Sequence, residues 1–211
     1  MYPTEVKAER IADSYVHAVG VFGAVVGAIV LVVSQVGLVS GAQLTALAIY
    51  GVALIATFVA SAIYHLAPWH DLRPTLRRYD HAAIYLKIAG TYTPLVVMVG
   101  TTFAYAILGV VWALAALGMT LKLFFWQTPG RFGPVLYLVM GWLSLLLIWS
   151  VWTTLPSATL ILIALGGLIY TGGVVFYKSK RPFTTAVWHG FVVVASACFW
   201  AAIAIGTMAV V

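Results

Sequence analysis

The sequence predicts an all-α integral membrane protein, a bundle of seven transmembrane helices. Two observations carry this prediction. Hydrophobic residues make up 64% of the 211 residues and charged residues only 8%, whereas a soluble domain carries about 25% charged residues. The apolar residues also come in long runs separated by short polar breaks, and a helix needs about 20 apolar residues to cross a bilayer.

Seven runs reach this length, and Gly and Pro occur in the breaks between them. The fifth run, for example, lies between the stretches "TPGRFGP" (128–134) and "TTLPSA" (153–158). Because no soluble segment, low-complexity tract or internal repeat interrupts the pattern, residues 1–211 are expected to form a single membrane domain. The predicted spans cover residues 15–36, 44–66, 79–99, 102–124, 132–152, 158–177 and 184–209.

The breaks alternate between uncharged and basic along the chain, which predicts the orientation. The breaks after the first, third and fifth spans carry no charge. Cytoplasmic loops are rich in Lys and Arg, so the N-terminus is expected inside and the C-terminus outside. The same pattern explains the pI of 9.6 without a nucleic-acid partner and leaves membrane lipids as the expected partners. Ten of the eleven basic residues lie on the predicted inner side: Lys7, Arg10, Arg73, Arg77, Arg78, Lys122, Arg131, Lys178, Lys180 and Arg181.

Ionisable residues inside the spans gather at the predicted cytoplasmic level. His65 ends the second span, Asp80 opens the third, and His189 lies in the second turn of the seventh. Ser61 lies one turn before His65 on the same helix face. Such residues are costly in a bilayer and usually face the bundle with a partner. Two imidazoles and a carboxylate can bind Zn²⁺, and an open fourth position would make the site catalytic.

Other interpretations of these residues stay open. A single His near a helix end is more often a hydrogen-bonded interfacial residue than a ligand. Asp80 could simply begin its helix, where a negative charge suits the helix dipole, and His81 is interpreted as a loop or interface residue outside the site. A series with i, i+4, i+8 spacing, to which the sequence assigns no role, lies at the foot of the first helix: Glu9, Asp13 and His17.

The eleventh basic residue, Lys87, lies inside the third span. It is seven residues after Asp80, or roughly 10 Å along a helix at about 1.5 Å per residue. Its side chain could bend back toward Asp80 or extend to the inner surface, and both alternatives stay open. Gly90, three residues later, would allow a neighbouring helix to approach closely.

Four stretches of the sequence resemble the signature blocks of the hemolysin III family, the bacterial branch of the progestin and adipoQ receptor superfamily. Their order and their positions in the first, second, third and seventh spans agree with that family, so the resemblance covers the whole chain. The stretches are "ERIADSYVHAVG" (9–20), "SAIYH" (61–65), "YDHAAIYLKIAGTYTP" (79–94) and "AVWHGFV" (186–192).

The resemblance implies a multi-pass protein of the bacterial plasma membrane with a Zn²⁺ site near the cytoplasmic face. His65 and His189 match metal ligands, Asp80 matches an acid that approaches the metal through water, and Ser61 matches a hydroxyl beside that water. The chain departs from the family pattern in three places. Thr185 stands where the H-x-x-x-H motif has its first His, Phe199 replaces another His, and Lys87 replaces an apolar residue.

Three classes of function remain open. The first is a zinc-dependent hydrolase of membrane lipid amides or esters, with Asp80 as acid/base and Ser61 beside the oxyanion. The second is a non-enzymatic regulator of the membrane. The third, a pore-forming cytolysin, is the least favoured, because no continuous polar stripe crosses the predicted bundle.

Overall fold

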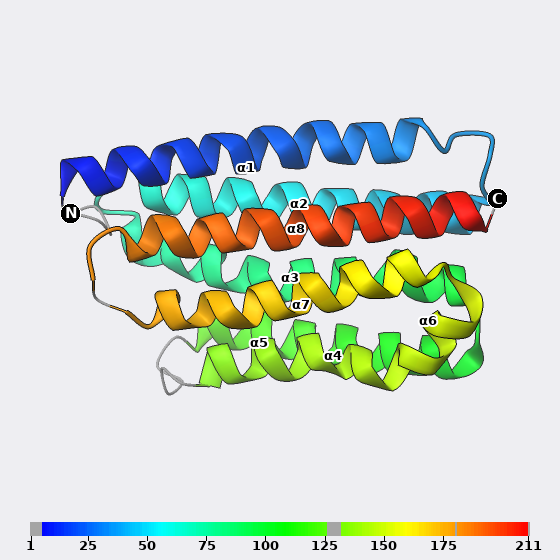
Figure 1. Cartoon of the computed structure of the whole chain (residues 1–211). Coiled ribbons are helices and arrows are strands. Elements are labelled where there is room, and N and C mark those ends of the chain that lie inside the picture. The colour runs from blue at the N-terminus through cyan, green and yellow to red at the C-terminus, as the bar shows by residue number, and fades with distance from the viewer. Residues whose placement is uncertain (1–5, 126–131, 180, 211) are drawn as a thin grey trace.

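Seven helical spans lie alongside one another in a computed structural model that describes residues 6–125, 132–179 and 181–210 (Figure 1). The prediction of seven long apolar helices is therefore confirmed. The start of the first helix and the end of the last helix lie at opposite ends of the bundle, as an odd number of spans requires. Arg131 and Lys180, which contributed to the predicted orientation, lie outside the described residues. The helices are α1 (Lys7–Val33), α2 (Gly41–Leu66), α3 (Arg73–Val99), α4 (Thr102–Phe124), α5 (Phe132–Trp142), η1 (Leu143–Leu147), α6 (Ile148–Thr154), α7 (Ser157–Tyr177) and α8 (Thr184–Ala209).

Two helices begin earlier than the apolar runs indicated. The predicted first and third spans start at residues 15 and 79, whereas α1 begins at Lys7 and α3 at Arg73. Hydropathy marks only the part of a helix that suits hydrocarbon, and a helix can continue beyond it into the polar interface. Asp80 therefore lies seven residues inside α3, and the interpretation that it begins the helix is wrong. Pro74 stands in the first turn of α3 instead, where its missing N–H costs nothing.

The fifth span is not a continuous α-helix. A 3₁₀ segment, η1, joins α5 to α6, and such a segment leaves some helical carbonyls without their usual partners. The Tyr92 hydroxyl donates to the carbonyls of Met140 and Gly141 at 2.8 and 2.9 Å. Ser144 Oγ also donates to the Gly141 carbonyl. Helix α3 therefore supports the fifth span at the point where it changes geometry.

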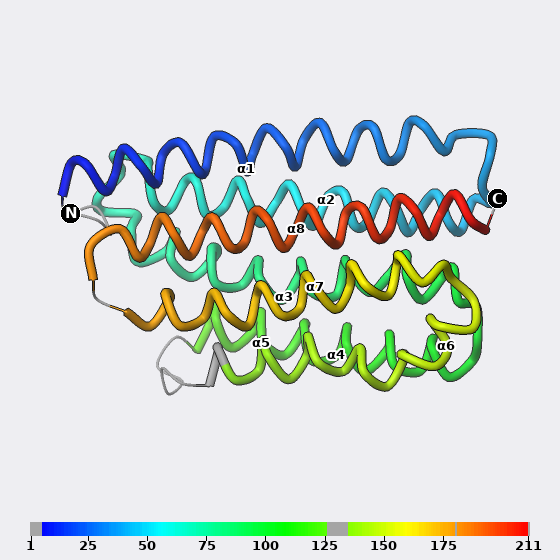
Figure 2. The backbone as a smooth tube through the Cα atoms, viewed as in Figure 1, coloured from blue at the N-terminus to red at the C-terminus, as the bar shows by residue number. Residues whose placement is uncertain are grey.

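Helix α3 is the most buried span of the bundle. In the most apolar 18-residue window of each span, 72% of the residues of α3 are buried, against at most 44% in the other six. It packs between α2 and α4, while α1 packs against α2 and α8, and α7 packs against α8. The tube drawing shows α1 and α4 on opposite sides of the bundle (Figure 2). Any polar group on the middle turns of α3 is consequently enclosed by protein.

Gly90 makes the contact between α3 and α2 close, as the sequence predicted. A Cβ added at Gly90 would lie 2.5 Å from the Cβ of Ala53 on α2, well inside van der Waals contact. Thr57, one turn after Ala53, donates its hydroxyl to the Ala83 carbonyl of α3 at 2.9 Å. Small residues and this hydrogen bond fix the two helices that carry His65 and Asp80.

Candidate metal centre and its cavity

Three side chains from three helices form the candidate metal centre: Asp13 of α1, His65 of α2 and His189 of α8. One ligand atom from each lies within 4.8 Å of the other two. His189 Nδ1 lies 2.6 Å from Oδ1 of Asp13, and His65 Nδ1 lies 3.4 Å from its Oδ2. Asp13 is only 2% exposed, so its charge depends on these imidazoles or on a cation.

The helices hold these side chains through local contacts. At the end of α2, the Arg73 guanidinium donates to the backbone carbonyls of Tyr64 and Ala67, the latter at 2.7 Å. The Tyr64 carbonyl belongs to the last turn of α2, where helical acceptors lack partners, and Ala67 is the C-cap residue of the helix. In α1, Asp13 and His17 are one turn apart and both buried. The end of α2 is thus fixed beside the centre, and Asp13 and His17 are enclosed by the bundle.

His17 connects the centre to Ser61. Its Nδ1 lies 2.8 Å from the Asp13 carbonyl, and its Nε2 lies 3.2 Å from Ser61 Oγ. Because a carbonyl can only accept, Nδ1 carries the proton. In the neutral imidazole, Nε2 therefore accepts from the Ser61 hydroxyl, and in the doubly protonated ring it donates to Ser61 Oγ.

The residues of the centre fit a zinc ion. His65 Nδ1 is buried and makes no hydrogen bond within the described chain. This ring nitrogen is therefore available as a metal ligand. Two imidazoles and one carboxylate form a recognised ligand set for catalytic zinc, which keeps the fourth position open. Asp13 supplies the third donor from α1, whereas the family pattern has its third donor at the position of Thr185 on α8.

The other residues that the sequence predicted for the site lie beside the centre. Asp80 is not among the three residues of the described group, and its Oδ2 lies 3.2 Å from His81 Nδ1. Asp80 and Ser61 line the same cavity as His65 and His189, and Thr185 lines it as well. The expected roles of Asp80 as ligand or acid/base and of Ser61 as hydroxyl donor stay predictions.

Sequence reasoning left Asp13, His17 and His81 out of the site. Asp13 and His17 were visible as an i, i+4 pair, but the predicted first span began only at residue 15, so nothing connected Asp13 to the bundle interior. His81 directly follows Asp80, and in a helix adjacent residues point about 100° apart. It nevertheless lines the cavity, where its Nε2 lies 3.4 Å from the Tyr177 hydroxyl.

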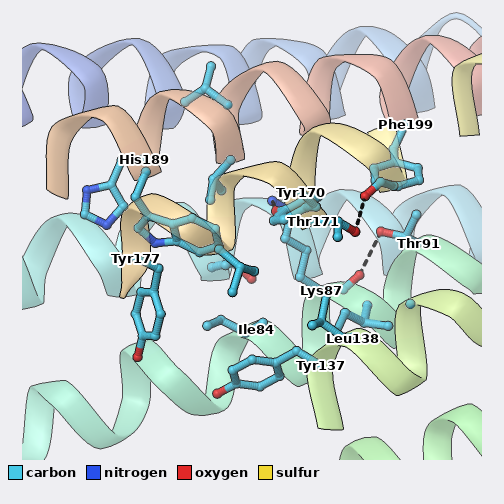
Figure 3. A pocket seen from close by; sticks show the side chains of 18 of the residues that line it. Ile84, Lys87, Thr91, Tyr137, Leu138, Tyr170, Thr171, Tyr177, His189 and Phe199 are labelled. Carbon is cyan, nitrogen blue, oxygen red and sulfur yellow. Dashed lines mark hydrogen bonds between the residues drawn. The ribbon is translucent and has the colours of Figure 1, made fainter. Parts of the chain in front are cut away.

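A cavity of about 400 Å³ extends from this cluster into the bundle. Figure 3 shows His189 at one end and Phe199 at the other, with the Lys87 side chain reaching from α3 toward Tyr170 of α7. Lys87 therefore follows neither expected course: its Nζ donates to Tyr170 Oη at 2.5 Å and to Ser196 Oγ at 2.6 Å. The cavity wall is otherwise mainly apolar, with Leu95 and Ile148 among its residues.

Seven apolar helices around a buried Asp–His cluster and a cavity define a polytopic membrane protein with a candidate metal centre inside the bundle. Sequence comparison gives the family. Residues 7–200 match the model of the Haemolysin-III related family, and the chain belongs to that family. The resemblance found in its four sequence blocks is thereby confirmed.

Relatives of known sequence include bacterial and animal proteins. The chain is 32% identical over 194 residues to the hemolysin-3 homolog of Bacillus subtilis, an alignment that covers 91% of each protein. It is 30% identical over 196 residues to hemolysin-3 of Bacillus cereus, covering 92% of this chain and 90% of the relative. It is 33% identical over 206 residues to the monocyte to macrophage differentiation factor of Homo sapiens, covering 92% and 83%. The human protein is a progestin and adipoQ receptor superfamily member.

Proposed function

We propose that this protein is a zinc-dependent hydrolase that cleaves an amide or ester bond of a membrane lipid. One observation carries the proposal: ligand atoms of Asp13, His65 and His189 converge within 4.8 Å, with both imidazoles lining a mainly apolar cavity. Candidate metal ligands beside a mainly apolar cavity suit a substrate that has a polar bond to be cleaved and a long alkyl chain. The distribution of basic residues supports a site on the cytoplasmic side of the bacterial plasma membrane.

Asp13, His65 and His189 would hold the ion. Bound Zn²⁺ supplies Lewis acidity, which polarises a carbonyl and makes water a stronger nucleophile at neutral pH. The chain contributes burial and geometry: Asp13 is buried, and hydrogen bonds from Arg73 hold the end of α2 that carries His65. Such fixed donors need no reorganisation when charge develops during the reaction.

Asp80 is the proposed general base and acid. Its carboxylate faces the same cavity as the centre and lies 3.2 Å from His81 Nδ1. A protonated His81 would form an ion pair with this carboxylate and hold it beside the cavity. Asp80 would take a proton from the attacking water and return it to the leaving amine or alcohol, a role that typically accelerates a reaction about 10²–10⁴-fold.

Ser61 is the proposed donor to the developing oxyanion. When His17 is neutral, the Ser61 hydroxyl donates to its Nε2 and is occupied. When His17 carries both ring protons, Nε2 donates to Ser61 Oγ, and the hydroxyl proton is available to a substrate oxygen. The state of His17 would thus determine whether Ser61 can stabilise negative charge.

A lipid can reach the cavity from the side of the bundle. Leu145 and Ile148 of the fifth span line the cavity, yet they are 53% and 48% exposed. These two side chains thus belong both to the cavity wall and to the exposed surface of the bundle. A substrate chain could therefore enter from the bilayer without passing through water.

The experiment that tests this function measures fatty acid release by mass spectrometry. Purified protein is incubated with lipids that share one acyl chain but carry it on an amide or an ester bond. Release should occur from at least one class, stop after chelation and return with added Zn²⁺. Zinc-loaded protein that cleaves neither class would contradict the proposal. If His65→Ala then still altered the membrane phenotype of cells, the protein would be a regulator.

A further inference from the structure

Lys87 is a basic residue buried in the middle of the bundle. It is 5% exposed and lies in the central turns of α3, the most buried helix. Its Nζ lies 4.7 Å from the ring centroid of Phe58 and 5.1 Å from that of Tyr170. Aromatic faces at this distance stabilise an ammonium group, but they do not neutralise its charge.

The hydrogen bonds of Lys87 leave one donor unused. Ser196 Oγ donates to the Val192 carbonyl, so it must accept the bond from Nζ. Tyr170 Oη accepts the second bond. A Lys ammonium has three N–H donors, and one N–H therefore remains without a hydrogen-bond partner among the described residues.

An anionic partner for Lys87 is missing among the residues that the structure describes. The described acidic residues are Glu9, Asp13, Asp71 and Asp80, and none forms an ion pair with its Nζ. Ionisable side chains inside a membrane bundle usually pair with an opposite charge or face a cavity. Lys87 faces the cavity, so the missing charge is expected from a ligand there.

We propose that Lys87 is the binding site for the carboxylate of a single-chain amphiphile, a fatty acid, held inside the cavity. The carboxylate pairs with Nζ. The alkyl chain lies against apolar side chains of the cavity wall, such as Leu95, Leu160 and Ile163. A volume of about 400 Å³ lies in the range of small-ligand sites, about 300–1,000 Å³, and favours one chain over two. A carboxylate also matches the charge and the single free donor better than an alcohol or ester does.

This site is separate from the candidate metal centre. Lys87 follows Asp80 by seven residues, or about 10 Å along α3, and none of the contacts of its Nζ involves His65, His189 or Asp13. The inference goes beyond the proposed hydrolysis and does not depend on it. A fatty acid would bind here whether or not the protein cleaves lipids.

The test compares two ligands that differ only in charge, dodecanoate and dodecanol. Their Kd values are measured on purified protein in maltoside micelles at several pH values on both sides of neutral, so that a condition with both the carboxylate and the ammonium charged is included. The wild type should bind dodecanoate about tenfold or more tightly than dodecanol, as expected for a hydrogen bond to a charged group. Lys87→Met should remove the preference. Lys122→Met is the matched control, because Lys122 is also buried but does not line the cavity.

A second variant and a second condition keep the outcome clear. Lys87→Gln retains hydrogen bonding without charge, and it should lose the preference even if Lys87→Met fails to fold. Chelation of metal should leave the preference intact. A wild type without preference, or a preference kept in Lys87→Gln, would overturn the proposal. A preference lost on chelation would place the carboxylate at the metal centre and would also overturn it.

Discussion

His189 Nδ1 lies 2.6 Å from Oδ1 of Asp13, although 176 positions of the chain separate the two residues. This contact joins the first and last transmembrane helices at the level where His65 also approaches Asp13. It places a carboxylate of α1 beside the two imidazoles as a third candidate ligand.

Thr185→His should strengthen metal binding. Thr185 is four residues before His189 on α8 and lines the same cavity, so the new imidazole would share a face with His189. An added ligand raises affinity for the folded state and hence raises Tm in the presence of zinc. Zinc affinity and Tm are measured with and without zinc, and Thr185→Ala serves as the control. Equal zinc affinity in both variants would argue against a metal near His189.

Asp80→Asn should lower lipid turnover by about 10²–10⁴-fold, the usual contribution of an acid/base group. The amide keeps the size and most hydrogen bonds of the side chain but cannot accept a proton. Zinc content should stay near the wild-type value, because Asp13, His65 and His189 form the group of donors. Asp71→Asn, at an exposed position before α3, should be silent. Loss of zinc together with activity would show that Asp80 is itself a ligand.

Gly90→Ala should destabilise the protein, by about 1–3 kcal/mol for overpacking in a tight core. The added Cβ would lie 2.5 Å from the Cβ of Ala53, and a Cβ atom cannot move away by rotation of a side-chain bond. Gly109→Ala is the matched control on α4, because its added Cβ would meet nothing within 4 Å. Thermal unfolding in detergent should give a lower Tm for Gly90→Ala than for Gly109→Ala. Equal Tm values would contradict the close packing of α2 against α3.

A reporter fused to the C-terminus should behave as periplasmic or extracellular. The same reporter inserted between α7 and α8, near Lys178 and Arg181, should behave as cytoplasmic, because basic loops stay inside. Alkaline phosphatase and a fluorescent protein give opposite signals on the two sides. The reverse pattern would place the candidate metal centre at the outer face.

The sequence predicts the helices better than it predicts the site. Apolar length defines seven spans, but it carries no information on how far a helix continues into the interface, so the starts of α1 and α3 were missed. Asp13 was missed for the same reason. Its i, i+4 relation to His17 was visible, yet its contact with His189 depends on how α1 packs against α8.

Lys87 illustrates a different limit. The spacing along α3 placed it about two turns from Asp80, which is correct, but the direction of its side chain depends on partners in other helices. Tyr170 and Ser196 lie 83 and 109 positions away in the chain. No periodicity within one helix connects residues at such separations, and only tertiary packing brings them to Nζ.

The central claim is that Asp13, His65 and His189 bind zinc, and metal content per protein tests it most directly. Wild-type protein, purified without added zinc, should retain about one Zn²⁺ per chain by elemental analysis. Asp13→Ala should lose most of it, because the remaining pair of imidazoles is a weak site, and His65→Ala should lose it as well. Glu9→Ala, one turn earlier on α1, should keep wild-type zinc. Wild-type zinc in Asp13→Ala, or no zinc in the wild type even after zinc is supplied, would contradict the account.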